Sequence, residues 1–175
     1  ICVYQGEELG LPEAEVPFEL LQDPYGIAFW PNFKGRDGCR TPMPWTDGER
    51  GGFTRAQPWL PIPDVHRSRS VERQHRDADS PLQRFRTFMR WRRAQPALLW
   101  GEVHMLYAPD PVLALERSLD GRRLRAWFNT GAEPVQFERN DGLTLRAVNG
   151  HGLVGGELDA NRIRLPAYGV LFAEG

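Results

Sequence analysis

The stretch GRDGCRTPMPW (residues 35–45) holds two arginines, an aspartate, two glycines and two prolines, and it ends on a tryptophan. Proline cannot continue a helix or a central strand, and glycine weakens both, so this composition predicts an ordered loop. We expect Gly35 and Gly38 to lie where a Cβ atom would clash, and the two prolines to stiffen the loop. Met43 and Trp45 are expected to pack it onto the rest of the molecule.

The chain around this loop has an ordinary composition for a soluble globular protein. Its 175 residues are 41% hydrophobic and 26% charged, and the formal net charge is −1. A protein that follows a nucleic acid backbone would carry a clear positive excess, so nucleic acid is not an expected partner. Lys34 is the only lysine among 22 basic residues, which fits codon bias in a GC-rich genome better than phosphate binding.

The cysteines, histidines and apolar runs exclude several classes of site. Cys2 and Cys39 supply neither a disulfide framework nor metal-ligand spacing, so we expect reduced, packed thiols and a cytoplasmic setting. The four histidines are far apart in the sequence, and no metal or cofactor is expected. No apolar run approaches the roughly eighteen residues of a membrane span, and ICVYQGEELG (1–10) resembles the interior of a longer chain rather than a signal peptide.

Before residue 80, one strand precedes a long irregular stretch. Residues 1–5 are short, apolar and β-branched, as in a strand buried on both faces. Residues 12–79 are interrupted by prolines but rich in aromatic residues, which predicts an ordered loop pinned by aromatic packing. Within it, residues 18–22 favour a short helix, and residues 64–79 are the most polar and least structured part.

The clearest helix is predicted over residues 80–95. Ser80 is a good N-cap, Pro81 suits the first helical position, and Gln83 completes a capping box. Pro96 ends the helix. An apolar stripe at helical spacing is typical of core packing; it contains Leu82, Phe85, Phe88 and Met89.

After residue 100, short alternating runs are separated by turn signals, which predicts an antiparallel β-sandwich or barrel. The dipeptides Asp120-Gly121 and Asp141-Gly142 are hairpin signals. Leu124, Ala126 and Phe128 should share one face of a strand. The boundary is expected near residues 97–101. One strand and one helix cannot form a domain alone, but they can be the last β/α unit of a barrel whose other units lie upstream.

Four stretches resemble the α-amylase superfamily of glycoside hydrolases, above all its α-glucosidase, oligo-1,6-glucosidase and sucrose-active branch. They are CVYQGEELGL (2–11), DPYGIAFWPNFKGRDGCRTPMPW (23–45), GGFTRAQPWLP (51–61) and SPLQRFRTFMRWRRAQPALLWGE (80–102). The resemblance implies an α/β (β/α)8 TIM barrel followed by an all-β C-terminal domain.

In this scheme, residues 1–100 are the end of the catalytic barrel and residues 101–175 the C-terminal antiparallel β-sandwich. Residues 2–5 would be the eighth barrel strand, residues 6–79 the loop that follows it, and residues 80–95 the eighth helix. Active sites of such barrels lie at the C-terminal ends of the strands, so the long loop would contact substrate.

The resemblance implies a retaining α-glucosidase that releases glucose from the non-reducing end of maltose-, isomaltose- or sucrose-type α-glucosides, with or without glucosyl transfer. The catalytic acids of the family precede the eighth strand, so none is expected in this chain, and the chain alone should be inactive. Glu7 and Glu8 are interpreted as backbone-capping or ion-pair acids. The expected partners are an oligosaccharide or glucoside substrate and the missing N-terminal part of the barrel.

Substrate contacts are assigned to Arg36 and Arg40. By resemblance, Arg36 pairs with an aspartate from an early barrel loop and holds the terminal hydroxyls of the bound glucose, since a guanidinium offers five donors. Arg40 is expected to brace the loop through a carboxylate or backbone carbonyls, and Asp37 is a candidate partner within the loop. Tyr25, Trp30 and Phe33 are either a stacking platform for a second sugar or aglycone, or packing that orders the loop.

Two different functions also fit the sequence. The chain could be a non-catalytic carbohydrate-binding or interaction module, with the β domain as the binder. Within the superfamily, a trehalose synthase or a sucrose isomerase would share much of this sequence pattern.

Overall fold

The computed structural model describes residues 2–175, which divide into two compact units. One unit reaches to Phe85 and the other runs from Arg86 to Gly175. This division by contacts falls inside a helix, whereas the sequence suggests a change near residue 100. The assignment of residues 1–100 and 101–175 as folding domains stays a prediction.

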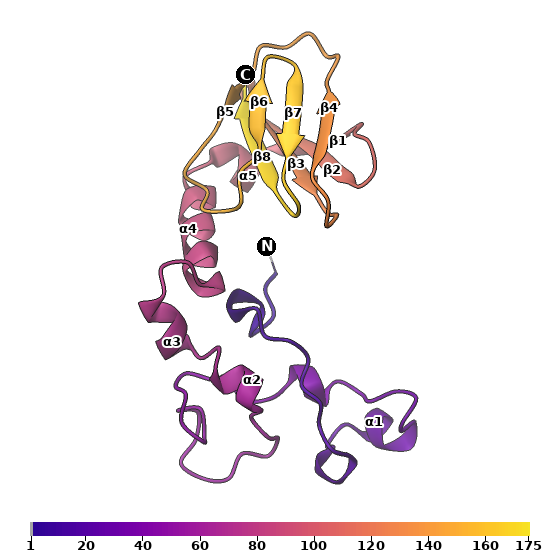
Figure 1. Ribbon diagram of the computed structural model, residues 1–175, viewed down its shortest axis with the longest axis vertical. Helices are drawn as coiled ribbons and strands as arrows, with labels where there is room; N and C mark the ends of the chain where they lie inside the picture. Colours follow the sequence, from indigo (N-terminus) through magenta and orange to yellow (C-terminus); the bar gives the residue numbers. More distant parts are fainter. Residues whose placement is uncertain (1) are drawn as a thin grey trace. The chain divides into compact units, whose positions relative to one another are not determined.

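The first unit consists of short helical elements joined by turns, as its many prolines predict. Its elements are the 3₁₀ turns η1 (Glu7–Leu9), η2 (Phe18–Leu20) and η3 (Asp37–Cys39), the helices α1 (Pro24–Ala28), α2 (Asp64–Arg67) and α3 (Val71–Arg76), and the start of α4 (Pro81–Arg93) (Figure 1). The turn η2 lies within the short helix expected at residues 18–22. Helices α2 and α3 give regular structure to residues 64–79, the stretch with the weakest sequence signal.

Residues 2–5, which the sequence predicts to be a strand, form no strand in the structure. Ile1, the first residue of that prediction, lies outside the described residues. A strand is defined by hydrogen bonds to a neighbouring strand, and no segment of residues 2–175 pairs with this one. Its place as a barrel strand depends on neighbours that the chain does not contain, so that assignment stays a prediction.

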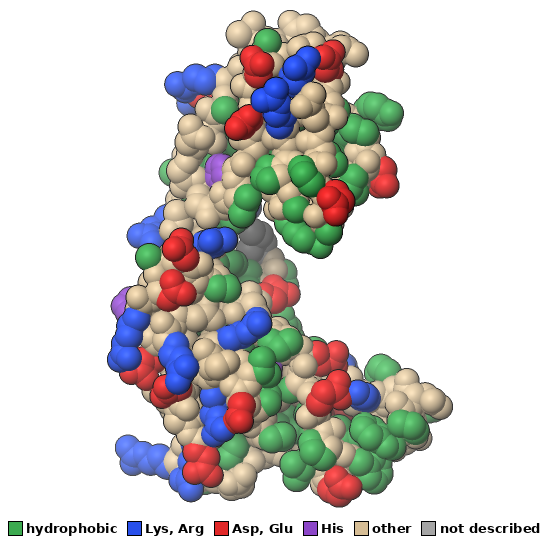
Figure 2. Space-filling model, in the orientation of Figure 1, with side chains coloured by type: hydrophobic (Ala, Val, Ile, Leu, Met, Phe, Trp, Pro, Cys, Tyr) green, Lys and Arg blue, Asp and Glu red, His purple; other side chains and the backbone are tan. Residues whose placement is uncertain are grey.

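The core of the first unit is aliphatic. One cluster joins Leu9, Met43 and Leu82, and another contains Ala14, Val16, Leu21 and Leu60. The aromatic residues expected to pin the long loop are instead between 37% and 63% exposed: Phe18, Tyr25, Phe29, Trp30, Phe33, Trp45, Phe53 and Trp59. Hydrophobic side chains are accordingly visible over the α1 region in Figure 2. A large aromatic ring becomes buried when two layers of secondary structure pack over it, and the short elements of this unit form no second layer.

The buried side chain of Gln74 joins three segments of the first unit. Its Nε2 donates to the carbonyls of Leu9 (2.9 Å) and Arg69 (2.8 Å). Its Oε1 accepts from the amide of Leu82 (3.0 Å), in the first turn of α4. One amide therefore satisfies backbone groups of η1, the α2–α3 connection and α4.

The start of α4 confirms the predicted N-cap but only half of the capping box. Ser80 Oγ accepts from the amide of Gln83 (3.3 Å). The Gln83 side chain, however, donates to the carbonyl of His75 (2.9 Å) rather than accepting from the Ser80 amide. The amide of Ser80 bonds to the carbonyl of Asp77 (3.2 Å) instead.

The second unit contains the rest of α4, helix α5 (Pro96–Trp100) and an antiparallel β module (Figure 1). Its strands are β1 (Glu102–Leu106), β2 (Val112–Leu119), β3 (Arg122–Asn129), β4 (Val135–Glu138), β5 (Arg146–Ala147), β6 (Glu157–Asp159), β7 (Arg162–Leu165) and β8 (Val170–Glu174). They form a five-stranded sheet in the order β1-β2-β3-β8-β5 and a three-stranded sheet in the order β4-β7-β6. The predicted C-terminal sheet domain is therefore present.

One of the two hairpin signals is confirmed. Asp120 and Gly121 both have positive φ, 49° and 78°, which fits a two-residue turn between the paired strands β2 and β3. The Asp141-Gly142 prediction is wrong, because β4 pairs with β7 and β5 pairs with β8. The partners of β4 and β5 are thus β7 and β8, which are distant in sequence.

The strand β3 is buried on both faces. Trp127 belongs to a cluster with Ile163 and Leu165 of β7, so side chains of the two sheets pack against each other. On the opposite face, Leu124 and Ala126 lie in a second cluster, as the alternation of the sequence predicts. This second cluster also includes Phe88 and Trp91 of α4, Leu98 of α5 and Phe172 of β8.

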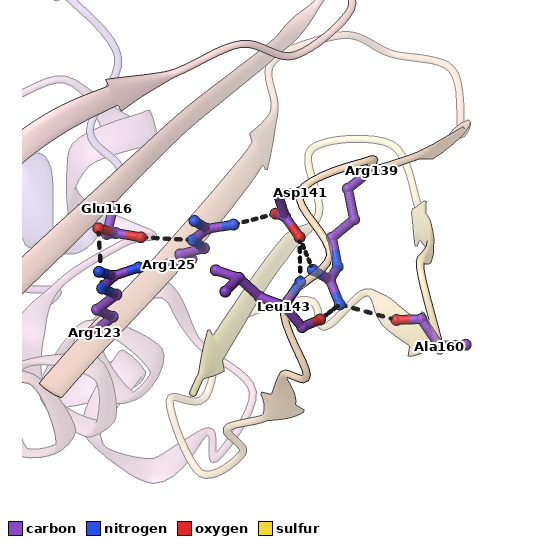
Figure 3. A network of polar contacts seen from close by, with 7 residues as sticks. All are labelled: Glu116, Arg123, Arg125, Arg139, Asp141, Leu143 and Ala160. Carbon is purple, nitrogen blue, oxygen red and sulfur yellow. Dashed lines mark hydrogen bonds and ion pairs between the residues drawn. The ribbon is translucent and has the colours of Figure 1, made fainter.

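An ion-pair network connects the two sheets (Figure 3). Arg125 of β3 pairs through Nε with Glu116 of β2 (2.7 Å) and through Nη1 with Asp141, which follows β4. Arg139 also pairs with Asp141. Although burial acts to raise the pKa of Asp141, the hydrogen bond from Leu143 and the two guanidinium groups lower it below its usual value.

The ring of His151 lies in the aromatic cluster of the second unit. Its centroid is 5.1 Å from that of Phe172 and 5.7 Å from that of Trp91, and its Nδ1 accepts from the amide of Leu153 (3.2 Å). Burial lowers the pKa of His151 below its usual value of 6.5. The imidazole is therefore favoured in its neutral form.

Replacement of Gln74 should destabilise the first unit strongly. Gln74→Ala leaves the Leu9 and Arg69 carbonyls and the Leu82 amide without their partner, which should lower the free energy of unfolding by about 1–3 kcal/mol. Urea denaturation of the full-length protein measures this loss. The matched control Gln83→Ala removes one exposed hydrogen bond and should change stability by less than about 0.5 kcal/mol. Equal losses in the two variants would contradict the role given to Gln74.

Stability should also fall as the pH drops below the usual His151 pKa of 6.5. The unfolded chain binds the proton more readily than the folded chain. The contribution of His151 to the free energy of unfolding is therefore complete above that pH, and it is lost as the pH falls toward the lower pKa of the folded protein. His151→Gln keeps an acceptor near the Leu153 amide but does not titrate. Comparison of urea midpoints at neutral and mildly acidic pH should show a smaller decline in the variant, and identical declines would exclude His151 as the cause.

Candidate functional site

The loop of residues 35–45 starts beside two buried carboxylates, Asp23 (3% exposed) and Asp37 (1% exposed). Asp37 Oδ2 accepts hydrogen bonds from the amides of Gln22 (2.6 Å) and Asp23 (2.8 Å). Asp23 Oδ2 in turn accepts from the amide of Arg36 (3.0 Å) and from its Nε (3.3 Å). Asp37 of the loop thus accepts from the backbone at residues 22 and 23, and Asp23 accepts from the backbone of the loop at Arg36.

Asp23 also begins α1. Its Oδ1 accepts from the amide of Tyr25 (3.1 Å), and Pro24 occupies the first helical position, an arrangement that favours a helix start. Burial alone would raise the pKa of Asp23, but the amides of Tyr25 and Arg36 and the Arg36 guanidinium outweigh it and lower the pKa below 3.8. Asp23 is therefore ionised at neutral pH.

The two glycines of the loop permit this close approach, as predicted. A Cβ atom on Gly35, which has a φ of +75°, would lie 2.9 Å from the Cα of Gly26. A Cβ atom on Gly38 would lie 2.5 Å from the carbonyl oxygen of Ala14. Side chains at either position would push the loop away from the segments that hold it.

The middle of the loop is held by a buried histidine. His66 (2% exposed) contacts Thr41 Oγ1 through Nδ1 (3.0 Å) and the carbonyl of Pro12 through Nε2 (2.8 Å). A carbonyl can only accept, so Nε2 carries a proton, and in the neutral ring Nδ1 accepts from the threonine hydroxyl. This tautomer connects the loop to the segment that follows η1.

The end of the loop is held by α3. The amides of Val71 and Glu72 donate to the carbonyls of Pro44 (2.9 Å) and Trp45 (3.0 Å). Met43 is buried, as expected, whereas the Trp45 side chain is 51% exposed in this chain, so its packing onto the barrel stays a prediction. Backbone hydrogen bonds hold this part of the loop in its place.

The two arginines of the loop differ in their surroundings. Arg36 is anchored to Asp23 while its side chain stays 63% exposed. Arg40 is half-buried, and its side chain makes no hydrogen bond or ion pair with any of residues 2–175, so the bracing contact predicted for it does not form there. Asp37, its candidate partner, binds backbone amides instead. The loop thus presents a guanidinium whose donors are available to hydroxyl or carboxylate oxygens.

The remaining predicted residues take structural or exposed positions. Glu7 and Glu8 accept from the amides of Tyr4 (3.2 Å) and Gly6 (2.8 Å), which confirms them as backbone-capping acids. Cys2 and Cys39 are free thiols but are exposed rather than packed. Across residues 2–175, no group of three His, Cys, Asp or Glu side chains is arranged to hold a metal ion. No helix in the described part of the chain is long and apolar enough to cross a membrane.

The sequence alone does not identify Asp23, His66 or Gln74 as residues that hold the site. The pair Asp23-Pro24 is a recognisable helix start and could have indicated the cap. The contacts to Arg36 and to Thr41 join residues 13 and 25 positions apart, so no local pattern reveals them.

Of the aromatic residues that are candidates for a stacking platform, Tyr25 lies against Phe29 with ring centroids 6.3 Å apart and planes inclined by 10°. Trp30 contacts Phe18, with ring centroids 5.7 Å apart. These contacts are compatible both with a platform for ligand and with packing within the loop.

Comparison with known proteins matches residues 1–101 to the family model described as "Alpha amylase, catalytic domain". A probable alpha-glucosidase of Rhizobium meliloti (strain 1021) is 46% identical over 173 residues, which are 99% of this chain and 31% of that protein. An oligo-1,6-glucosidase of Parageobacillus thermoglucosidasius is 26% identical over 158 residues, which are 79% of this chain and 28% of that protein.

Among solved structures, the crystal structure of the alpha-glucosyl transfer enzyme XgtA is similar with a TM-score of 0.95 and 46% sequence identity. The match covers 99% of this chain and 32% of that chain. The chain therefore spans about a third of the length of the relatives it matches.

The contact between Asp23 and Arg36 gives a pH-dependent test. Asp23→Asn keeps a side-chain oxygen for the Tyr25 amide but removes the charge, so it should lower stability at neutral pH. Because folding lowers the pKa of Asp23, its contribution is present above pH 3.8 and disappears as the pH falls through the folded pKa. The difference between wild type and variant in urea midpoint should therefore shrink in acid. A difference that stays constant from neutral to acidic pH would contradict an ionic role.

Proposed function

Because this chain belongs to the α-amylase family of glycoside hydrolases, we propose that it is the C-terminal portion of a retaining α-glucosidase. The complete enzyme would release glucose from the non-reducing end of maltose-, isomaltose- or sucrose-type α-glucosides. This chain would supply one wall of the sugar pocket, and its partner would be the N-terminal part of the same barrel. The names of its relatives, a probable alpha-glucosidase and an oligo-1,6-glucosidase, support this function.

The resemblance assigns the terminal hydroxyls to Arg36, and the unpartnered guanidinium of Arg40 is the observation from which we propose that Arg40 shares this contact. An enzyme that removes a terminal glucose must hold hydroxyls that lie far from the bond it cleaves. A guanidinium offers five donors in a rigid fork, and Arg40 uses none of them within residues 2–175. The loop that carries it is held by three buried polar side chains: Asp23, Asp37 and His66. Such a loop needs little ordering when substrate binds.

Arg36 has a different part in this proposal. Its Nε is held by Asp23, while the rest of its exposed side chain can reach substrate or a carboxylate of the barrel. Asp23 thus fixes the direction of one arginine, and the backbone of η3 fixes the position of the other. We infer that Arg36 and Arg40 both line the substrate pocket.

The catalytic acids are proposed to lie outside this chain. A retaining glycosidase needs two carboxyl groups about 5–5.5 Å apart on either side of the glycosidic bond. The buried acids Asp23 and Asp37 are poor candidates, because neither is exposed and each accepts backbone hydrogen bonds. Glu7 and Glu8 cap the turn at η1. The chain alone should therefore be inactive.

In the complete barrel, residues 2–5 would form the eighth strand once the neighbouring strands supply hydrogen bonds, and α4 would be the eighth helix. The long loop between them would then lie at the C-terminal end of the barrel, where active sites of this fold are built. The proposed cytoplasmic location is supported by the two free cysteines.

Glucosyl transfer is the second candidate function, favoured by the name of the structural relative XgtA, an alpha-glucosyl transfer enzyme. Hydrolysis and transfer share the step that forms the glycosyl-enzyme and differ in whether water or another hydroxyl attacks it. A trehalose synthase or a sucrose isomerase would differ from a hydrolase in the same later step. The loop would hold the same glucose in each case.

Kinetics of the two arginine variants test the proposal in the full-length enzyme. Arg40→Ala should lower kcat/KM for glucose release by at least about tenfold, which corresponds to about 1.4 kcal/mol, with little change in Tm. Arg36→Ala should lower Tm as well, since it leaves the buried Asp23 carboxylate without its cation. A loss of Tm with unchanged kinetics in Arg40→Ala would show that Arg40 is only structural.

A further inference from the structure

Thr41, the residue that follows Arg40, is held through both its side chain and its backbone. Its side chain is 4% exposed, and its Oγ1 lies 3.0 Å from Nδ1 of His66. Its carbonyl accepts a hydrogen bond from Nε2 of Gln5 (3.2 Å). Segments that lie 36 residues before and 25 residues after Thr41 therefore meet beside Arg40.

The orientation of the His66 ring is itself fixed from outside the loop. His66 belongs to α2 and is 2% exposed, and its Nε2 donates to the carbonyl of Pro12 (2.8 Å), which follows η1. A buried imidazole with a partner at each nitrogen keeps one orientation, because rotation would leave two buried polar groups without hydrogen bonds. The position of Thr41 Oγ1 is therefore set by α2 and by the segment after η1.

The backbone on the other side of Arg40 is fixed by η3. The amide of Arg40 donates to the carbonyl of Asp37 (2.9 Å), whose carboxylate accepts from the amides of Gln22 and Asp23. The backbone of Arg40 is thus held from both directions, while its guanidinium has no partner within residues 2–175. These contacts determine where the Arg40 side chain starts and leave its donors unused.

Gln5 relates these contacts to the proposed barrel. If residues 2–5 form the eighth strand, Gln5 lies at the C-terminal end of that strand, where active sites of this fold are built. The hydrogen bond from Gln5 to Thr41 then fixes the distance between the strand end and Arg40. This distance matters, because a misplacement of about 1 Å in a group that holds substrate can lower a rate by about 100-fold.

We propose that Gln5, Thr41 and His66 are positioning residues for Arg40. They set the distance of its guanidinium from the sugar hydroxyls, and none of the three needs to touch substrate. This inference rests on the proposed function, because the three residues affect glucose release only through Arg40. The loss of the Thr41 hydroxyl and the loss of the Arg40 side chain should therefore not have independent effects.

Steady-state kinetics of the full-length enzyme with a p-nitrophenyl α-glucoside test this role. Thr41→Val keeps the size and branching of the side chain but cannot bond to His66, and it should lower kcat/KM by about fivefold, as expected for one lost buried hydrogen bond. Thr41→Ser restores the hydroxyl and should recover kcat/KM to within about twofold of the wild type. Gln5→Met removes the donor to the Thr41 carbonyl from an exposed residue, and it should also lower kcat/KM.

Ser80→Ala is the matched control for a general loss of stability. It also removes a buried hydroxyl, which donates to the carbonyl of Gln74 (2.7 Å) and accepts from the amide of Gln83 (3.3 Å). It should lower Tm about as much as Thr41→Val does and leave kcat/KM unchanged. A fall in kcat/KM as large as that of Thr41→Val would overturn the proposal, because the kinetic effect would then follow stability alone.

A double-mutant cycle with Arg40→Ala separates the positioning role from the proposed function. Thr41→Val should lower kcat/KM in the wild type but cause no further loss in Arg40→Ala. The same loss in both backgrounds, or no loss in the wild type, would overturn the positioning role and leave the proposed contact between Arg40 and the sugar standing. Unchanged kcat/KM in Arg40→Ala alone would instead contradict that contact, and the positioning role with it.

Discussion

Two buried carboxylates hold the loop of residues 35–45 in place. Asp37 accepts from the backbone at residues 22 and 23, and Asp23 accepts from the backbone and side chain of Arg36. Buried carboxylates are tolerated when hydrogen bonds or cations compensate the loss of water. The Oδ2 atoms of both residues obtain that compensation from each other's segments, whereas Asp37 Oδ1 is buried without a partner among the described residues. The arrangement couples the start of α1 to the start of the loop. The positions of Arg36 and Arg40 depend on it.

The rest of the loop is stabilised in the same manner, by polar side chains and backbone groups rather than by a large apolar core. His66 connects Thr41 to Pro12, Gln74 connects three segments, and α3 binds the carbonyls at residues 44 and 45. A loop built this way can leave aromatic rings exposed, because it does not need them for its own order. In the proposed enzyme, those exposed rings and Arg40 face substrate or the remaining barrel.

Local patterns in the sequence predict the local elements well. The N-cap at Ser80 and the hairpin at Asp120-Gly121 each depend on a few neighbouring residues and are confirmed. The close approaches at Gly35 and Gly38 are also confirmed, although the atoms approached belong to the distant residues Gly26 and Ala14. The second hairpin signal, at Asp141-Gly142, fails because β4 pairs with β7 and β5 pairs with β8. No local pattern predicts the Asp23–Arg36 pair or the His66 contacts, since they join residues that are distant in sequence. A strand at residues 2–5 would need hydrogen bonds from neighbouring strands, and none of residues 2–175 supplies them.

The central claim is that this loop forms one wall of a pocket for a terminal glucose. A crystal structure of the full-length enzyme with bound glucose tests it most directly. The account predicts the Arg40 guanidinium within hydrogen-bond distance of the sugar hydroxyls, with the contact between Asp23 and Arg36 intact. A guanidinium that points away from the sugar, with both arginines engaged only by protein groups, would contradict it.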